Sequence, residues 1–154
     1  MSFKIFSGIY KSSRDIKIET KNIYNTKDYL SRNIKKINKQ IGKNGIINYN
    51  YDFNAVVATN LIIKKKIKIV DFGGGLGNSY IDLFKKLNSK NFSYTIYDFE
   101  EVIEKTKKIL RVNDKIQTTN LKFVSKIKNL TRCDILHFGN CLEHLEDFDD
   151  IFSK

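Results

Sequence analysis

Proline and tryptophan are missing from this sequence altogether, and cysteine occurs only twice, as Cys133 and Cys141. Two cysteines are too few for a disulfide framework of the kind that small secreted domains use. Long hydrophobic runs are also missing, since no apolar stretch approaches the roughly 20 residues of a membrane-spanning helix. No charged-then-apolar leader opens the chain. We therefore expect a cytoplasmic protein without a membrane span.

Acidic residues are scarce relative to basic ones: 17 Asp and Glu stand against 28 Lys and Arg, for a net charge of +11. Such a balance can indicate a nucleic-acid partner. Here, however, the lysines are spread among Asn and Ile, and base-stacking aromatic residues are not interleaved with them. A solvated lysine face, or a compositional bias of the coding sequence, is the simpler interpretation. The 41% of hydrophobic residues suits one globular domain with its own core.

Hydrophobic periodicity predicts two helices followed by an alternating α/β pattern. The first helix would begin after Thr26 and end at Gly42, and the second would lie within residues 51–66 with one apolar side formed by Phe53, Val56, Val57 and Leu61. From there the pattern predicts strands at 67–72, 92–99, 121–127 and 133–140, and helices at 78–87 and 100–111. We expect an N-terminal helical or lid region at 1–65. The expected core, 66–154, is a mostly parallel Rossmann-like sheet with helices on both faces.

A cluster of four glycines directly follows the first predicted strand, in the stretch "IKIVDFGGGLGNSY". A phosphate-binding P-loop is excluded because the loop has no lysine before Ser79. The dinucleotide fingerprint G-x-G-x-x-G fails at one position, where Asn78 replaces glycine. The pattern acidic-x-G-x-G-x-G is met throughout, by Asp71, Gly73, Gly75 and Gly77, with Gly74 between them. Such a loop would let a ligand approach the backbone, while the carboxylate would meet a cationic group directly or through water.

A second carboxylate, Asp98, ends the second predicted strand about 20 residues after the glycine loop. A carboxylate at this position commonly binds the two hydroxyl groups of a ribose. Asp98 would also suit the N-cap of the following helix. Position and spacing together favour the ribose interpretation.

Three motifs resemble those of the class I S-adenosylmethionine-dependent methyltransferases: the glycine loop, "YDFEEVIEK" after the second strand, and "CDILHFGNCLEHL" around the fourth. The resemblance implies S-adenosylmethionine as the cofactor. It also implies cofactor-pocket roles for Phe99 against the adenine, for Ser125 in place of the acid that many relatives have, and for Asn140. His144 would begin the substrate side.

The N-terminal segment is similar to that of a narrower family, methyltransferases associated with surface-polysaccharide and O-antigen biosynthesis. Phe6, Gly8, Tyr10 and Tyr80 match its motifs. This resemblance implies a small hydroxyl- or amine-bearing acceptor such as a sugar or glycan precursor.

The histidines and cysteines form the spacing C-x3-H-x3-C-x2-H, which suggests zinc. One tetrahedral site is hard to close, because Cys133 and His137 belong to a strand while the other two residues lie beyond its end. We therefore expect no metal. His137 suits a packed strand position. At the pocket edge, His144 would accept the proton released as the methyl group transfers, or else only shape the pocket.

The class I fold has seven strands, the last three of which follow the "LEH" segment, and this chain ends at Lys154, about ten residues beyond that segment. A C-terminally truncated core would leave the fourth predicted strand as an exposed edge, for a second chain or another copy of this one to cover. Two alternatives to a methyltransferase stay open: a non-catalytic remnant that binds cofactor or a partner, and an NAD-dependent oxidoreductase. A nucleic-acid amino-methyltransferase lacks support, because its Asn/Asp-Pro-Pro-aromatic signature needs proline.

Overall fold

The computed structural model describes residues 27–42, 51–87, 91–112, 116–139 and 141. The helices are α2 (Lys27–Gly42), α3 (Tyr51–Ile63), α4 (Asn78–Leu87) and α5 (Glu100–Arg111), with a 3-10 turn η2 (Ile127–Asn129). The strands are β1 (Ile67–Phe72), β2 (Phe92–Tyr97), β3 (Leu121–Val124) and β4 (Ile135–Phe138). The bounds of α2, β1, α4 and α5 are those expected from the sequence, whereas β2, β3 and β4 are shorter than expected.

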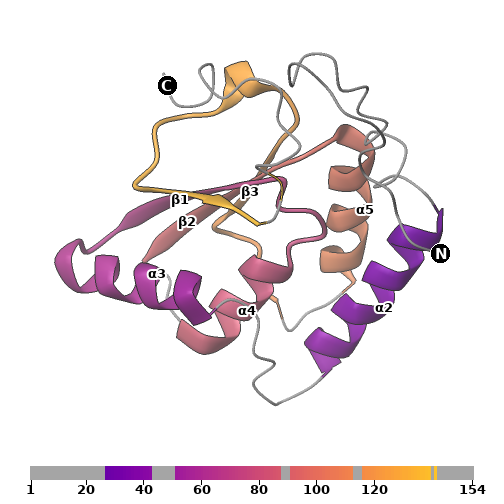
Figure 1. Cartoon of the computed structure of the whole chain (residues 1–154), viewed down its shortest axis with the longest axis horizontal. Helices are drawn as coiled ribbons and strands as arrows, with labels where there is room; N and C mark the ends of the chain where they lie inside the picture. Colours follow the sequence, from indigo (N-terminus) through magenta and orange to yellow (C-terminus); the bar gives the residue numbers. More distant parts are fainter. Residues whose placement is uncertain (1–26, 43–50, 88–90, 113–115, 140, 142–154) are drawn as a thin grey trace, which may run out of the picture.

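The four strands form one parallel sheet in the order β3-β2-β1-β4. The chain moves outward from β1 to β3 and then crosses to the other side of β1 to form β4. The strand order therefore reverses between β1 and β4. In sheets of this kind, ligands bind beyond the carboxyl ends of the strands at such a reversal. The loop after β1 lies at that position (Figure 1).

One face of the sheet carries the hydrophobic core. Alternate residues of β1 and β2 point to this face, and all four α-helices contribute to the same cluster. Among its buried members are Ile37 of α2, Val57 of α3, Leu83 of α4 and Leu110 of α5. In Figure 1, α3 and α4 lie below the strands, and the orange segment that contains η2 lies above them. The predicted α/β class is confirmed, and the described α-helices all pack on one face.

Helix α3 differs in one respect from the expected apolar side. Phe53 and Val57 are buried as predicted, but Val56 is 48% exposed and Asn54 is buried in its place. Asn54 donates a 2.8 Å hydrogen bond to Asp82 of α4, which also pairs with Lys86 at 2.8 Å. A buried polar contact between helices thus replaces the apolar one that periodicity alone would favour.

The helices before residue 66 share the core with the sheet, since α2 and α3 both contact α4. The expected division at residues 65 and 66 stays a prediction. None of the helices in the described ranges has the length and apolar character to cross a membrane.

Candidate functional site

Residues 73–77 form the loop that joins β1 to α4. Gly73, Gly75 and Gly77 have φ values of 69°, 55° and 81°, in the left-handed region that side chains disfavour. The Gly73 N–H donates to the Tyr97 carbonyl at 2.8 Å, and the Gly77 N–H donates to the Gly74 carbonyl at 3.0 Å. The glycines therefore allow a tight turn that is fastened to the neighbouring strand β2.

The surroundings of each glycine show which part of the loop faces open space. A Cβ atom on Gly74 would come 2.8 Å from Oδ2 of Asp71, and one on Gly77 would come 3.2 Å from Cδ1 of Ile96. A Cβ on Gly75 would meet no described heavy atom within 4 Å. Gly75 is thus the position at which a ligand can approach the backbone.

Cys141 lies against the start of the loop. Its thiol donates to the Phe72 carbonyl at 2.8 Å, and a Cβ on Gly73 would come 2.8 Å from the Cys141 sulfur. Cys141 therefore lies directly against the first glycine of the loop.

Asp71 lies beneath the loop and is only 1% exposed. Its Oδ2 accepts a 2.7 Å hydrogen bond from the Tyr94 hydroxyl, and its Oδ1 lies 2.8 Å from Nδ1 of His137. The His137 ring stacks on Phe53 of α3, with 4.1 Å between ring centroids. Both oxygen atoms of Asp71 thus have protein partners. Because the carboxylate is also buried beneath the loop, an ammonium group of a ligand would reach it only through water or after a local rearrangement.

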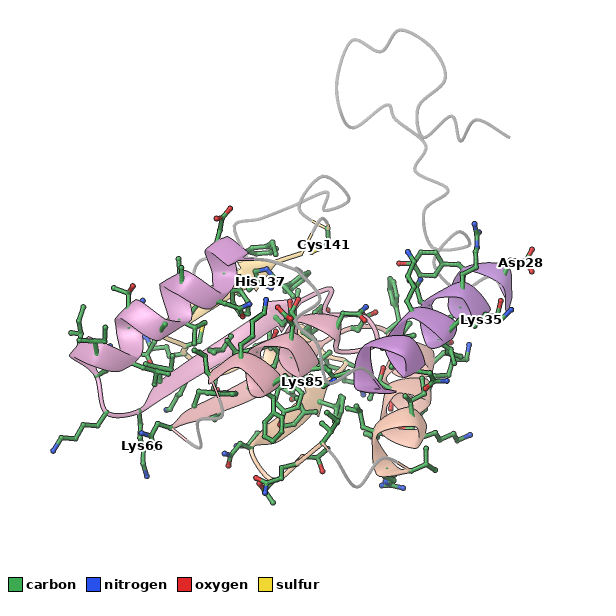
Figure 2. All side chains as sticks on the ribbon, turned by 90° about the horizontal axis from the view of Figure 1, so that it is seen from below. Asp28, Lys35, Lys66, Lys85, His137 and Cys141 are labelled. Atoms are coloured by element: carbon green, nitrogen blue, oxygen red, sulfur yellow. The ribbon has the colours of Figure 1, made fainter. Side chains whose placement is uncertain are left out.

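Burial raises the pKa of the Tyr94 hydroxyl well above its usual value, and the nearby negative charge and hydrogen bond of Asp71 raise it further. Tyr94 is therefore a fixed hydrogen-bond donor. His137 and Cys141 lie close to each other in Figure 2. Both contact the end of β1, His137 through Asp71 and Cys141 through the Phe72 carbonyl.

Asp98 follows β2 and fixes the backbone of Gly75, the glycine that faces open space. Its Oδ2 accepts a 2.8 Å hydrogen bond from the Gly75 N–H, and its Oδ1 accepts one of 2.7 Å from the Phe99 N–H. Burial raises the pKa of the Asp98 carboxyl, the two backbone hydrogen bonds oppose this rise, and the negative charge of Asp71 adds to it. Asp98 and Asp71 are therefore close enough to interact electrostatically.

The remaining predicted positions lie at the ends of β2 and β3. Phe99 is 49% exposed beside Asp98. The Ser125 hydroxyl, just after β3, donates a hydrogen bond to the carboxylate of Glu100 in the first turn of α5. Asn140 and His144 lie outside the described residues, so their predicted roles stay predictions.

Two residues of this site did not emerge as site residues from the sequence, Tyr94 and His137. Their contacts depend on which strands are neighbours: His137 is paired in register with Asp71, and Tyr94 belongs to the strand on the other side of β1. Glu100 was likewise missed, although an acid at the start of a helix after the second strand was a visible signal. In the part of the chain that the structure describes, no three potential metal ligands gather into a group.

No protein-family model matches the sequence, and no curated protein sequence matches it. Solved structures do match. The plantazolicin methyltransferase BpumL in complex with SAH gives a TM-score of 0.53 at 18% identity, covering 84% of this chain and 48% of BpumL. The CurJ carbon methyltransferase gives 0.51 at 15% identity, covering 66% of this chain and 29% of CurJ.

A second BpumL structure, in complex with a monoazolic desmethylPZN analog and SAH, gives a TM-score of 0.50 at 18% identity. At such identities the similarity establishes the fold alone, and it confirms the predicted Rossmann-like methyltransferase architecture. The chain spans about half the length of BpumL and under a third of that of CurJ.

Proposed function

We propose that this chain binds S-adenosylmethionine at the glycine loop and supports methyl transfer to a small acceptor. One observation carries the proposal. The loop presents its backbone at Gly75, and the N–H of that glycine donates to Asp98, the carboxylate that we assign to the ribose. The structural neighbour BpumL, in complex with SAH, supports the same cofactor class.

The charges at the site fit this cofactor better than a phosphate-bearing one. S-adenosylmethionine carries a sulfonium and an ammonium group and no phosphate. The described part of the site contains the carboxylates of Asp71, Asp98 and Glu100. The loop itself contains no lysine or arginine. Nearby carboxylates attract a cation and repel a phosphate, because opposite charges in a partly desolvated site interact strongly.

The ribose contact would use acceptor capacity that Asp98 retains. Each of its oxygen atoms accepts one backbone hydrogen bond, and a carboxylate oxygen can accept a second. Phe99 offers an exposed ring beside it for the adenine. Ser125, and Asn140 outside the described residues, complete the set that we propose for the cofactor.

When bound, the cofactor would supply an activated methyl group. The chain's contribution would be to hold the acceptor in line with that group, an alignment that can carry much of the rate. We assign the acceptor to small hydroxyl- or amine-bearing molecules, with a sugar or glycan precursor favoured by the N-terminal motif of Phe6, Gly8 and Tyr10. His144 would take the proton that the acceptor loses.

Transfer of an isotope-labelled methyl group from S-adenosylmethionine tests the proposal. The full chain is incubated with the labelled cofactor and a panel of sugar nucleotides, glycan precursors and small amines. We expect label in one acceptor class. Cofactor binding without transfer to any acceptor would favour a cofactor-binding module, and binding of NAD in preference to S-adenosylmethionine would refute the proposal.

A further inference from the structure

The hydrogen-bonded group of Tyr94, Asp71 and His137 joins three neighbouring strands directly below the glycine loop. We propose that His137 is a positioning residue for this loop: through Asp71 it holds the backbone in the shape that binds the cofactor. The inference rests on the proposed function, because the ligand of the loop is taken to be S-adenosylmethionine or its demethylated product, S-adenosylhomocysteine.

The buried position of Asp71 makes its hydrogen-bond partners necessary. A carboxylate that is 1% exposed is costly unless hydrogen-bond donors replace the water it has lost. Two partners are described: the Tyr94 hydroxyl, which donates at 2.7 Å, and Nδ1 of His137 at 2.8 Å, which donates when it carries the ring hydrogen. Loss of either one leaves a buried oxygen atom with reduced compensation and favours a new position for the carboxylate.

Asp71 also lies in contact with the loop. Gly74 lies so close above the carboxylate that a Cβ atom there would come 2.8 Å from Oδ2 and 2.9 Å from Cγ. Any new position of Asp71 therefore changes the support beneath Gly74. The next residue, Gly75, is the one that faces open space and is held by Asp98. Displacement of Asp71 thus changes the shape of the loop where a ligand would bind.

The His137 side chain is held in two separate ways. An ionised carboxylate only accepts hydrogen bonds, so Nδ1 of His137 must carry the hydrogen that faces Asp71. Stacking on Phe53 fixes the plane of the ring, with 27° between the two ring planes. The side chain is therefore held both by its ring face and by its hydrogen bond. These two restraints can be removed separately by mutation.

Two variants separate the hydrogen bond from the stacking. His137→Asn keeps a donor near the position of Nδ1 and loses the ring, whereas His137→Phe keeps a ring to stack on Phe53 and loses the donor. Calorimetric titration of the full chain with S-adenosylhomocysteine measures the result. We expect His137→Phe to weaken binding about tenfold and His137→Asn to restore most of the wild-type affinity, because the hydrogen bond to a charged group is the part that matters.

Nitrogen NMR of the imidazole groups provides a second readout, taken on the wild-type chain. The chain has only two histidines, so the His137 signals are assigned by their loss in His137→Asn. We expect the hydrogen on Nδ1 and a shift of the Nδ1 signal when S-adenosylhomocysteine is added. A neutral ring with its hydrogen only on Nε2 would overturn the inference.

The failures of the two proposals are distinguishable. If wild type binds S-adenosylhomocysteine and His137→Phe binds it equally well, the positioning role is wrong and the proposed function stands. If wild type does not bind the ligand while Nδ1 carries its hydrogen, the proposed cofactor is wrong, and the role of His137 toward that cofactor falls with it.

Discussion

Substitution of Gly75 by alanine separates the cost of backbone strain from the cost of blocking a ligand. The φ of 55° at this position places alanine in the left-handed region, at a cost of about 1 kcal/mol in the free energy of unfolding. No described atom within 4 Å would clash with the added methyl group. For a chain of this length we expect the melting temperature to fall by about 3 °C.

Gly75→Ala should lower the affinity for the cofactor by more free energy than it lowers stability. The Gly75 N–H is held by Asp98 at 2.8 Å, and its carbonyl oxygen lies 3.1 Å from the Thr106 hydroxyl. The backbone therefore cannot rotate freely to move the new methyl group out of the open space. If the cofactor packs there, its affinity should fall at least about tenfold, equivalent to about 1.4 kcal/mol.

Gly77→Ala is the matched comparison. Its φ of 81° is also left-handed, but its Cβ would point inward, 3.2 Å from Cδ1 of Ile96. Crowding in the core adds to the strain, for a stability loss of about 2 kcal/mol. We expect Gly77→Ala to lose more stability and Gly75→Ala to lose more affinity, as measured by thermal unfolding and by calorimetry with S-adenosylhomocysteine. If the two variants lost stability and affinity to the same extent, the added methyl group at Gly75 would not be blocking a ligand.

Three further predictions concern buried polar groups. Tyr94→Phe removes one donor from Asp71 and should lower the free energy of unfolding by about 1.5 kcal/mol in denaturant titrations. Lys86→Met removes one partner of Asp82, which is 4% exposed, and should cost about 2 kcal/mol in the same assay. Because burial raises the pKa of Asp98 above 3.8, the affinity for S-adenosylhomocysteine should weaken as pH falls through that raised pKa, at a higher pH than for an ordinary aspartate.

The stability contribution of Asp98 should have the opposite sign to its effect on binding. A carboxyl whose folded pKa is raised binds its proton more tightly in the folded state, so its contribution to stability increases as pH falls through that pKa. Asp98→Asn, which cannot titrate at this position, should weaken both trends by the contribution of Asp98. Wild-type affinity that does not change with pH in this range would contradict the assignment of Asp98 to the ligand.

An exposed ion pair serves as the control for the Lys86 variant. Lys107 and Glu104 lie on the surface of α5, with side chains 32% and 52% exposed. Solvent-exposed pairs of this kind contribute little to stability. We expect Lys107→Met to have the same free energy of unfolding as wild type. If this variant lost as much stability as Lys86→Met, removal of a charge in general, and not burial, would be the cause.

The sequence predicted the elements well because each carried a local signal. Helix α5 begins with acids and ends with bases, as its dipole favours, and its bounds agree with expectation. The left-handed glycines follow a β-branched strand, so the loop could also be located. Val56 was assigned wrongly because periodicity describes the apolar side of a helix but does not reveal that Asn54 has a buried partner 28 residues away.

The contacts beneath the glycine loop could not be predicted from the local sequence. The contact of His137 with Asp71 joins residues 66 positions apart, and it exists because β4 pairs with β1 rather than with β3. The alternation of strands and helices does not by itself indicate where the chain reverses its order in the sheet. The pairing of Ser125 with Glu100 likewise depends on β3 lying beside β2.

Calorimetric titration of the full chain with S-adenosylmethionine and, separately, with NAD shows directly which cofactor the glycine loop binds. We expect saturable binding of S-adenosylmethionine and no comparable binding of NAD. We also expect Gly75→Ala to bind S-adenosylmethionine more weakly than wild type. Tighter binding of NAD, or S-adenosylmethionine binding that Gly75→Ala leaves unchanged, would contradict these expectations.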